Sequence, residues 1–209
     1  MANKPTLPDA LAVMVDIFHE YASKEGNAHS LNKGEFKALI NSQFPHVFEN
    51  STDKEGIQKL MNNLDSDRSG EIDFSEYMTF LASLAVMCNE HLLESKKGCQ
   101  KPCNIMAGKP TLSDALAVMV GIFHEYAGKD GNACSLNKGE FKALIESQFP
   151  HVFENSKDKE GIQKLMNDLD RDKSGEIDFT EYMTFLASLA VVCNEYLLQS
   201  LKEGKKSCK

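Results

Sequence analysis

The sequence predicts an all-α protein made of two copies of one four-helix unit. The chain has 209 residues, and residues 1–96 align without gaps on residues 106–201, with about 80 of 96 positions identical. Within each copy, four segments carry apolar residues at helical spacing and are separated by polar segments. Such a tandem duplication predicts two units of about 95 residues, each large enough to bury a modest core.

The first helix is predicted over residues 7–22. Thr6 and Asp9 stand at its start, where a hydroxyl and a carboxylate can accept hydrogen bonds from free backbone N–H groups. Its apolar residues cover a wider part of the helix surface than the single apolar stripe that a helix needs to pack against one core. A second apolar partner must therefore cover the remaining face.

The next three helices follow from periodicity and from one proline. A second helix over residues 33–43 ends near Pro45, because the residue before a proline avoids the helical region. Residues 44–52 then form a hinge, and a third helix spans residues 53–64. The fourth helix, over residues 74–93, is apolar on nearly all sides, so it also requires a further partner.

A twelve-residue pattern of oxygen ligands separates the third and fourth helices. Residues 65–76 read Asp-Ser-Asp-Arg-Ser-Gly-Glu-Ile-Asp-Phe-Ser-Glu, and residues 170–181 keep every ligand position. Such spacing aims alternate residues at one point, and Ca²⁺ takes six to eight oxygens at about 2.3–2.6 Å. A solvated acidic turn is the alternative, which two near-identical copies argue against. The expected ligands are Asp65, Asp67, Ser69, the Glu71 carbonyl and bidentate Glu76, with Asp73 acting through water, and then Asp170, Asp172, Ser174, Glu176 and Glu181.

The loop between the first and second helices fits no standard calcium template. Residues 22–35 read Ala-Ser-Lys-Glu-Gly-Asn-Ala-His-Ser-Leu-Asn-Lys-Gly-Glu and follow Phe-His-Glu-Tyr at residues 18–21. With the proline-interrupted hinge and the long last helix, this loop resembles the pseudo EF-hand of the S-100 family. The resemblance covers nearly all of both copies.

The resemblance implies that backbone carbonyls supply most ligands of the loops at 22–35 and 127–140, with one bidentate glutamate in each. The implied ligands are Ala22, Glu25, Asn27, Ser30 and Glu35, and in the second copy Ala127, Asp130, Asn132, Ser135 and Glu140. It also implies short β-bridges that pair Leu31 with Ile72 and Leu136 with Ile177. Up to four Ca²⁺ per chain are expected, with weaker binding in the pseudo loops because only one ligand there is charged. The alternative is a structural turn that stays empty in cells.

Members of the S-100 family are usually homodimers whose first and last helices form a shared core. The resemblance therefore implies units at residues 1–95 and 106–209, joined by a linker at residues 96–105 and packed as a pseudo-symmetric intrachain dimer. Pairing between chains, as a homodimer or by domain swapping, is the alternative.

Three functions suit such a protein. A calcium sensor would expose an apolar groove and bind amphipathic segments of target proteins, whereas a buffer would bind Ca²⁺ without opening. Zn²⁺ sequestration is the third, but Asn89 and Leu93 stand where relatives of this family carry zinc ligands, so a complete site is not expected. The expected groove residues are Val47, Phe48, Ile57, Leu60, Met61, Met78, Leu81 and Leu92, with Val152, Phe153, Ile162, Leu165, Met166, Met183, Leu186 and Leu197 in the second copy.

Composition excludes several other classes. A formal net charge of -8 without a basic cluster argues against nucleic-acid binding, and no apolar run reaches the ~20 residues of a transmembrane helix. Six scattered cysteines with no secretory signal predict reduced thiols and a cytoplasmic location, with non-classical secretion as the alternative. No phosphate loop or activated nucleophile is present, so the sequence predicts a protein that is not an enzyme.

Overall fold

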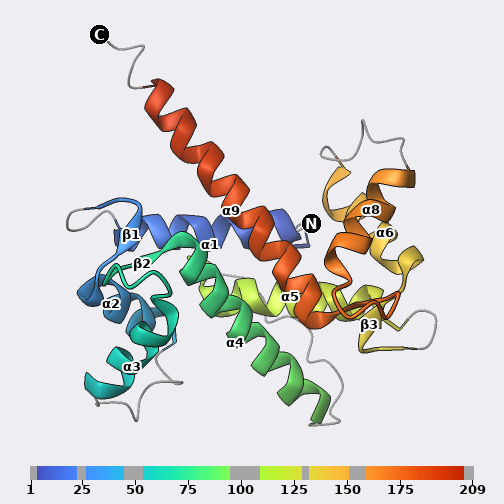
Figure 1. The fold of residues 1–209 in the computed structure, drawn as a ribbon, viewed down its shortest axis with the longest axis horizontal. Coiled ribbons are helices and arrows are strands. Elements are labelled where there is room, and N and C mark those ends of the chain that lie inside the picture. Colours follow the sequence, from blue (N-terminus) through green and yellow to red (C-terminus); the bar gives the residue numbers. More distant parts are fainter. Residues whose placement is uncertain are drawn as a thin grey trace.

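The computed structural model describes residues 4–22, 27–44, 54–94, 109–128, 132–150 and 159–204, and gives only the backbone for residues 54–58, 91–94, 159–163 and 199–204. This part of the chain contains eight helices and four two-residue strands, in two repeats of the same order (Figure 1). The first unit comprises α1 (Leu7–Ala22), β1 (Ser30–Leu31), α2 (Lys33–Gln43), α3 (Lys54–Leu64), β2 (Ile72–Asp73) and α4 (Phe74–Glu94). The second comprises α5 (Leu112–Tyr126), β3 (Ser135–Leu136), α6 (Lys138–Gln148), α8 (Lys159–Leu169), β4 (Ile177–Asp178) and α9 (Phe179–Gly204).

The predicted all-α architecture of two four-helix units is confirmed. Helices α1 and α2 have the predicted bounds, and α4 extends one residue beyond its predicted end. Helix α3 starts at Lys54, and the predicted hinge at residues 44–52 lies outside the described residues except for Phe44.

Local hydrogen bonds explain where α1 and α5 begin. Asp9 accepts hydrogen bonds from the backbone N–H and the hydroxyl of Thr6, at 2.9 and 2.7 Å. In the second unit Thr111 and Asp114 form a complete capping box. These side chains satisfy N–H groups that the first helical turn leaves without partners.

An aromatic cluster holds the end of α1 against the start of α4. The ring centroid of Phe18 lies 5.1 Å from that of Phe74 and 5.2 Å from that of Tyr77. The Tyr77 hydroxyl is fully buried and donates a 3.2 Å hydrogen bond to the carbonyl of Met14, and burial raises its pKa well above the usual value. Because α1 leads into one loop and α4 follows the other, this cluster fixes the two loops of a unit near each other.

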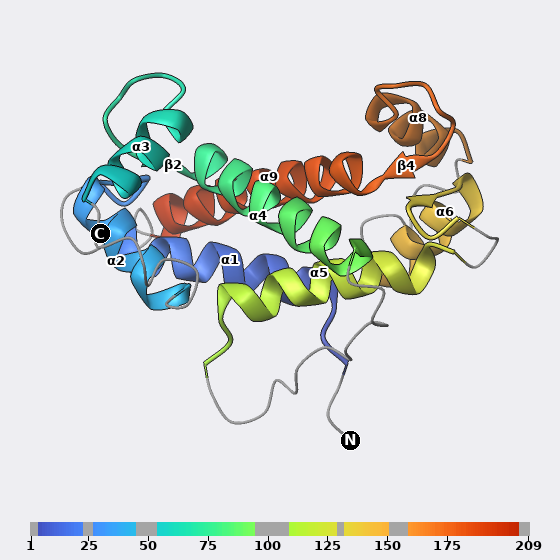
Figure 2. The ribbon, with the colours of Figure 1, turned by 90° about the horizontal axis from the view of Figure 1, so that it is seen from below.

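The first and last helices of both units form one shared core. Helix α1 packs along α5 and α4 packs along α9, with further contacts between α1 and α9 and between α4 and α5. Figures 1 and 2 show these four helices at the centre, with α2 and α3 at one end and α6 and α8 at the other. The second unit thus covers the surplus apolar faces of α1 and α4, as the sequence predicted.

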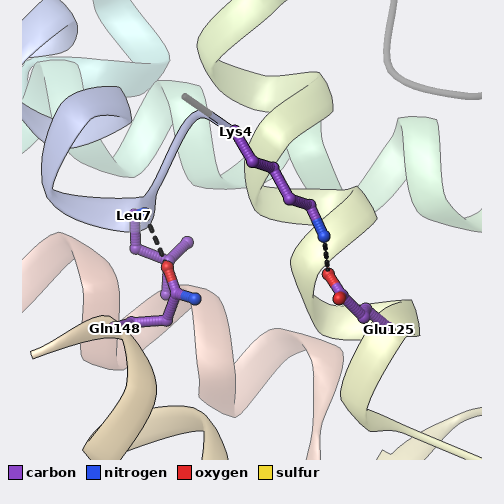
Figure 3. A network of polar contacts seen from close by, with 4 residues as sticks. All are labelled: Lys4, Leu7, Glu125 and Gln148. Atoms are coloured by element: carbon purple, nitrogen blue, oxygen red, sulfur yellow. Dashed lines mark hydrogen bonds and ion pairs between the residues drawn. The ribbon is translucent and has the colours of Figure 1, made fainter. Parts of the chain in front are cut away.

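Reciprocal polar contacts relate the two units by a pseudo-two-fold axis. The backbone N–H of Leu7 donates to Gln148 Oε1 at 3.0 Å (Figure 3). In the reciprocal contact, the backbone N–H of Leu112 donates to Gln43 Oε1 at 3.1 Å. Each glutamine ends a helix of one unit and satisfies a first-turn N–H group of the other. A contact that occurs twice with its partners exchanged is the signature of a self-complementary interface.

Two ion pairs repeat the same symmetry at the rim of this interface. Lys4 pairs with Glu125, as Figure 3 shows, and Lys109 pairs with Glu20. All four side chains are largely exposed, and such pairs contribute only about 0–1 kcal/mol. These ion pairs therefore contribute to the relative orientation of the units and add little to the free energy of their association.

Helices α4 and α9 are the longest, with 21 and 26 residues. Within the described residues, neither they nor any other helix is both long and apolar enough to span a membrane.

Candidate metal centre

The structure brings three carboxylates together in each twelve-residue loop. One ligand oxygen from each of Asp65, Asp67 and Glu76 lies within 4.8 Å of the other two. The same holds for the second unit, at Asp170, Asp172 and Glu181. In the part of the chain that the structure describes, these are the two groups of three or more His, Cys, Asp or Glu side chains with this proximity.

Backbone conformation produces the turn that gathers these side chains. Arg68 and Gly70 have φ angles of 58° and 81°, in the left-handed region that residues with a Cβ rarely adopt. A Cβ at position 70 would meet no atom within 4 Å. Glycine is therefore required at this position for its backbone freedom rather than for space.

Backbone N–H groups hold the first two carboxylates in place. The N–H of Ser69 donates to Asp65 Oδ1 and to Asp67 Oδ1, both at 2.8 Å, and the N–H of Gly70 donates to Asp65 Oδ2 at 2.9 Å. The N–H of Ser69 is also the main reason why the pKa of Asp67 lies below its usual value. The loop therefore keeps this carboxylate ionised, which is the form that binds a cation.

Glu76 is the buried member of the cluster. Its side chain is only 8% exposed, and its two carboxylate oxygens accept hydrogen bonds from the N–H groups of Ser66 and Asp73, at 2.7 and 3.1 Å. The ion pairs found among the described residues do not include Glu76. A buried carboxylate beside two more carboxylates is costly unless a positive charge compensates it.

Asp73 has a role that the ligand template did not predict. Its Oδ1 accepts a 2.8 Å hydrogen bond from the N–H of Glu76, so it caps the first turn of α4. Its contact with an ion through water stays a prediction.

The donor set fits a hard cation such as Ca²⁺. Besides the three carboxylates, the loop offers two further oxygens, the Ser69 hydroxyl and the Glu71 carbonyl, which lie 3.1 Å apart. All five predicted positions offer oxygen, without nitrogen or sulfur, as calcium prefers. The second loop repeats these contacts at Ser174 and Glu176.

The pseudo loops are described in part, because Glu25 and Asp130 lie outside the described residues. Asn27 lies in the loop before β1, Ser30 is the first residue of β1, and Glu35 stands in the first helical turn of α2 at 7% exposure. Glu35 forms a capping box with Asn32, whose N–H it accepts at 3.0 Å. Ala22, Ala127, Asn132, Ser135 and Glu140 occupy the predicted positions, and their roles as ligands stay predictions.

Helix α5 ends one residue earlier than α1. Ala127 caps it in an extended conformation, and Gly128 follows with a φ of 82°. A Cβ on Gly128 would lie 3.3 Å from Cα of Ala133, so the second pseudo loop turns where glycine is preferred.

Short antiparallel bridges join the two loops of each unit, as predicted. Leu31 pairs with Ile72, and Leu136 pairs with Ile177. All four side chains are fully buried. The backbones of the two loops are therefore joined directly to each other.

The histidines of α1 and α5 lie at the interface between the units. Nε2 of His19 is 2.6 Å from Asn194 Oδ1, and Nε2 of His124 is 2.7 Å from Asn89 Oδ1. Neither histidine belongs to a group of three potential metal ligands among the described residues. Burial lowers the pKa of His124, against the opposite effect of a hydrogen bond with the backbone of Ala133.

Comparison with known protein families agrees with the geometry of both kinds of loop. Residues 7–51 and 112–156 match the S-100/ICaBP type calcium binding domain. Residues 57–81 and 162–186 match the EF hand. The matched segments cover both predicted loops of each unit.

Proposed function

Since the chain belongs to the S-100 family, as a tandem duplication of its calcium-binding unit, we propose that it is a calcium sensor that engages target proteins. Calcium binding by its EF-hands is the activity of the family, and target binding is the step that we add. The observation that carries the proposal is the pair of acidic clusters, each with one buried glutamate in an EF-hand loop.

We propose Asp65, Asp67, Ser69, the Glu71 carbonyl and Glu76 as the ligands of the first standard loop, with their equivalents in the second. When bound, calcium supplies two positive charges that offset two of the three negative charges of the carboxylates. The chain's own contribution is preorganisation, because backbone N–H groups already orient all three carboxylates. Residues 1–95 and 106–209 are the proposed units around these loops.

We propose that the pseudo loops provide two further, weaker sites. Glu35 and Glu140 support this proposal, because each is buried at the first turn of a helix whose N-terminal dipole favours an anionic side chain. The remaining donors are carbonyls, which carry no formal charge. Calorimetric titration should resolve two tight and two weaker sites, and E35Q with E140Q should abolish the weaker pair while both standard sites still bind.

The proposed target surface is apolar and mostly covered in the described structure. Met61, Met78 and Leu81 are buried, whereas Leu197 of the last helix is 44% exposed. The sensor function requires that such side chains become accessible in the calcium-loaded protein. Methionine suits this role because its flexible side chain adapts to different apolar partners. The predicted groove residues of the hinge, Val47, Phe48, Val152 and Phe153, lie outside the described residues.

Calcium-dependent retention on a phenyl column tests the sensor proposal. The wild-type chain should be retained in calcium and released by chelator, and the double variant E76Q/E181Q should elute without retention in both conditions. Heat of binding without a change in retention would instead indicate a calcium buffer. No uptake at millimolar free calcium would refute the calcium function itself.

We also propose a cytoplasmic location. The free thiols of Cys88, Cys134 and Cys193 support it, because reduced cysteines are typical of that compartment.

A further inference from the structure

One carboxylate of each standard loop is bonded inside the neighbouring pseudo loop. Glu71 is the seventh residue of its loop, where the calcium template uses only the backbone carbonyl. Its side chain extends to the pseudo loop, where Oε2 accepts a hydrogen bond from the Ser30 hydroxyl. Ser30 is only 8% exposed, so this contact is largely shielded from water.

A third side chain completes the link. Asn27 Nδ2 donates to the Ser30 hydroxyl oxygen at 2.8 Å, and Asn27 Oδ1 accepts the N–H of His29 at 3.1 Å. The N–H of Ser30 donates to the Asn27 carbonyl at 3.4 Å. The segment from Asn27 to Ser30, which holds two of the proposed carbonyl ligands, is thus fixed by a chain of hydrogen bonds that ends on Glu71.

The second unit repeats the link. The Ser135 hydroxyl donates to Glu176 Oε2, and Asn132 Nδ2 donates both to the Ser135 hydroxyl at 2.6 Å and to Glu176 Oε2 at 3.1 Å. The repetition occurs although Cys134 replaces His29 inside the turn and Asp130 replaces Glu25 before it. The link therefore does not depend on the residues that differ between the copies.

We infer that Glu71 and Glu176 are positioning residues that couple the two calcium sites of each unit through Ser30 and Ser135. The inference rests on the proposed sites in both loops. In Glu71, the carbonyl belongs to the standard site and the carboxylate holds the turn of the pseudo site. An ion that holds the Glu71 carbonyl in the standard site therefore also restricts the Glu71 carboxylate in the pseudo loop, and the reverse holds as well.

The backbone bridge between Leu31 and Ile72 also joins the loops, but it fixes a different part of the pseudo loop. The bridge pairs the backbones of Ser30 and Leu31 with those of Asp73 and Ile72, whereas the Glu71 carboxylate bonds the Ser30 side chain and, through it, the turn that begins at Asn27. Coupling by the bridge alone predicts that loss of the Ser30 hydroxyl leaves communication between the sites unchanged. Coupling by the Glu71 side chain predicts that loss of the Ser30 hydroxyl weakens this communication.

A thermodynamic cycle separates the two cases. In the full chain with E140Q and E181Q, only the first unit binds, and E35Q then measures how much an active pseudo site improves binding at the standard loop. Coupling is reciprocal, so the same factor applies in both directions. S30A should reduce this coupling factor by about tenfold or more, the effect of one lost hydrogen bond to a charged group. It leaves the net charge unchanged, and S30T, which keeps the hydroxyl, should restore the factor.

Hydrogen exchange in the calcium-free protein supplies a second readout. S30A should speed exchange of the Ser30 and His29 amides and leave the matching amides of the second unit unchanged, and S135A should do the reverse. If S30A keeps the coupling factor and the exchange rates of wild type while calcium still binds, the inference is wrong and the proposed function stands. If neither loop takes up calcium, the proposed function itself fails.

Discussion

Replacing Glu76 by glutamine tests the standard site at its most informative position. The substitution keeps the shape and one carbonyl oxygen of the side chain but removes the negative charge and one of the two oxygens that we propose as ligands. The structure makes this position decisive, because Glu76 is the buried carboxylate of its cluster and is held by two backbone N–H groups. Its equivalent Glu181 stays intact in the same chain and serves as an internal reference.

The expected loss can be worked from electrostatics. A carboxylate about 2.4 Å from a divalent ion contributes about 3.5 kcal/mol even at the dielectric constant of water. That energy corresponds to about 300-fold in affinity. A glutamine also presents an NH₂ group to either Ser66 or Asp73, whose N–H then loses its acceptor, so preorganisation weakens as well.

Isothermal titration calorimetry of wild type, E76Q and E181Q measures the effect, with circular dichroism of the calcium-free chain as the folding control. Each variant should lose one tight site and keep the other. E90Q removes an equal charge from an exposed position of the same helix and should leave both tight sites within about twofold, because exposed charges at a distance are screened. Two tight sites in E76Q with wild-type affinity would refute the assignment of Glu76 as a ligand.

Three further predictions concern stability, each measured by urea denaturation of the calcium-free chain. Q148A should lower the free energy of unfolding by about 1 kcal/mol, because the N–H of Leu7 loses its partner from the other unit; an unchanged value would show that water replaces the glutamine. Y77F should also cost about 1 kcal/mol, because the hydroxyl that bonds the Met14 carbonyl is buried. Burial lowers the pKa of His124 in the folded state, so folding favours the neutral imidazole. The contribution of His124 to the free energy of unfolding should therefore be fully present above about pH 6.5 and be lost as the pH decreases from there through the folded pKa. H124Q should remove this part of the pH dependence, and an identical pH profile in H124Q would contradict the assignment.

The helices and standard loops were predictable because their signals are local. Apolar spacing fixes residues 7–22 and 33–43 as helices, and the oxygen pattern of residues 65–76 is read within twelve positions. The bridge between Leu31 and Ile72 followed from the family resemblance, since it joins residues 41 positions apart that no local rule connects. Its observation supports the assignment of residues 22–35 as the partner loop.

The contacts that join distant parts of the chain were not predictable from the sequence. Gln43 ends α2 without any pattern around it, yet it accepts the N–H of Leu112, 69 positions away. The side chain of Glu71 was missed for another reason, because the calcium template assigns only its carbonyl. Glu35 was predicted as a ligand, and its second role in the capping box with Asn32 was hidden by that assignment. When a residue makes two kinds of contact, the sequence pattern predicts only the one that belongs to a known template.

Joining two units in one chain changes what their pairing depends on. Separate subunits lose their shared core on dilution, whereas a short linker holds its ends at an effective concentration of about millimolar. Each half can then diverge where it does not face the other. The substitutions His29 to Cys134, Ser66 to Arg171 and Met87 to Val192 all fall on exposed positions. The residues of the reciprocal contacts between the units are unchanged, and so are the proposed ligands of the standard loops. We infer that pairing and calcium coordination are the constraints that both copies share.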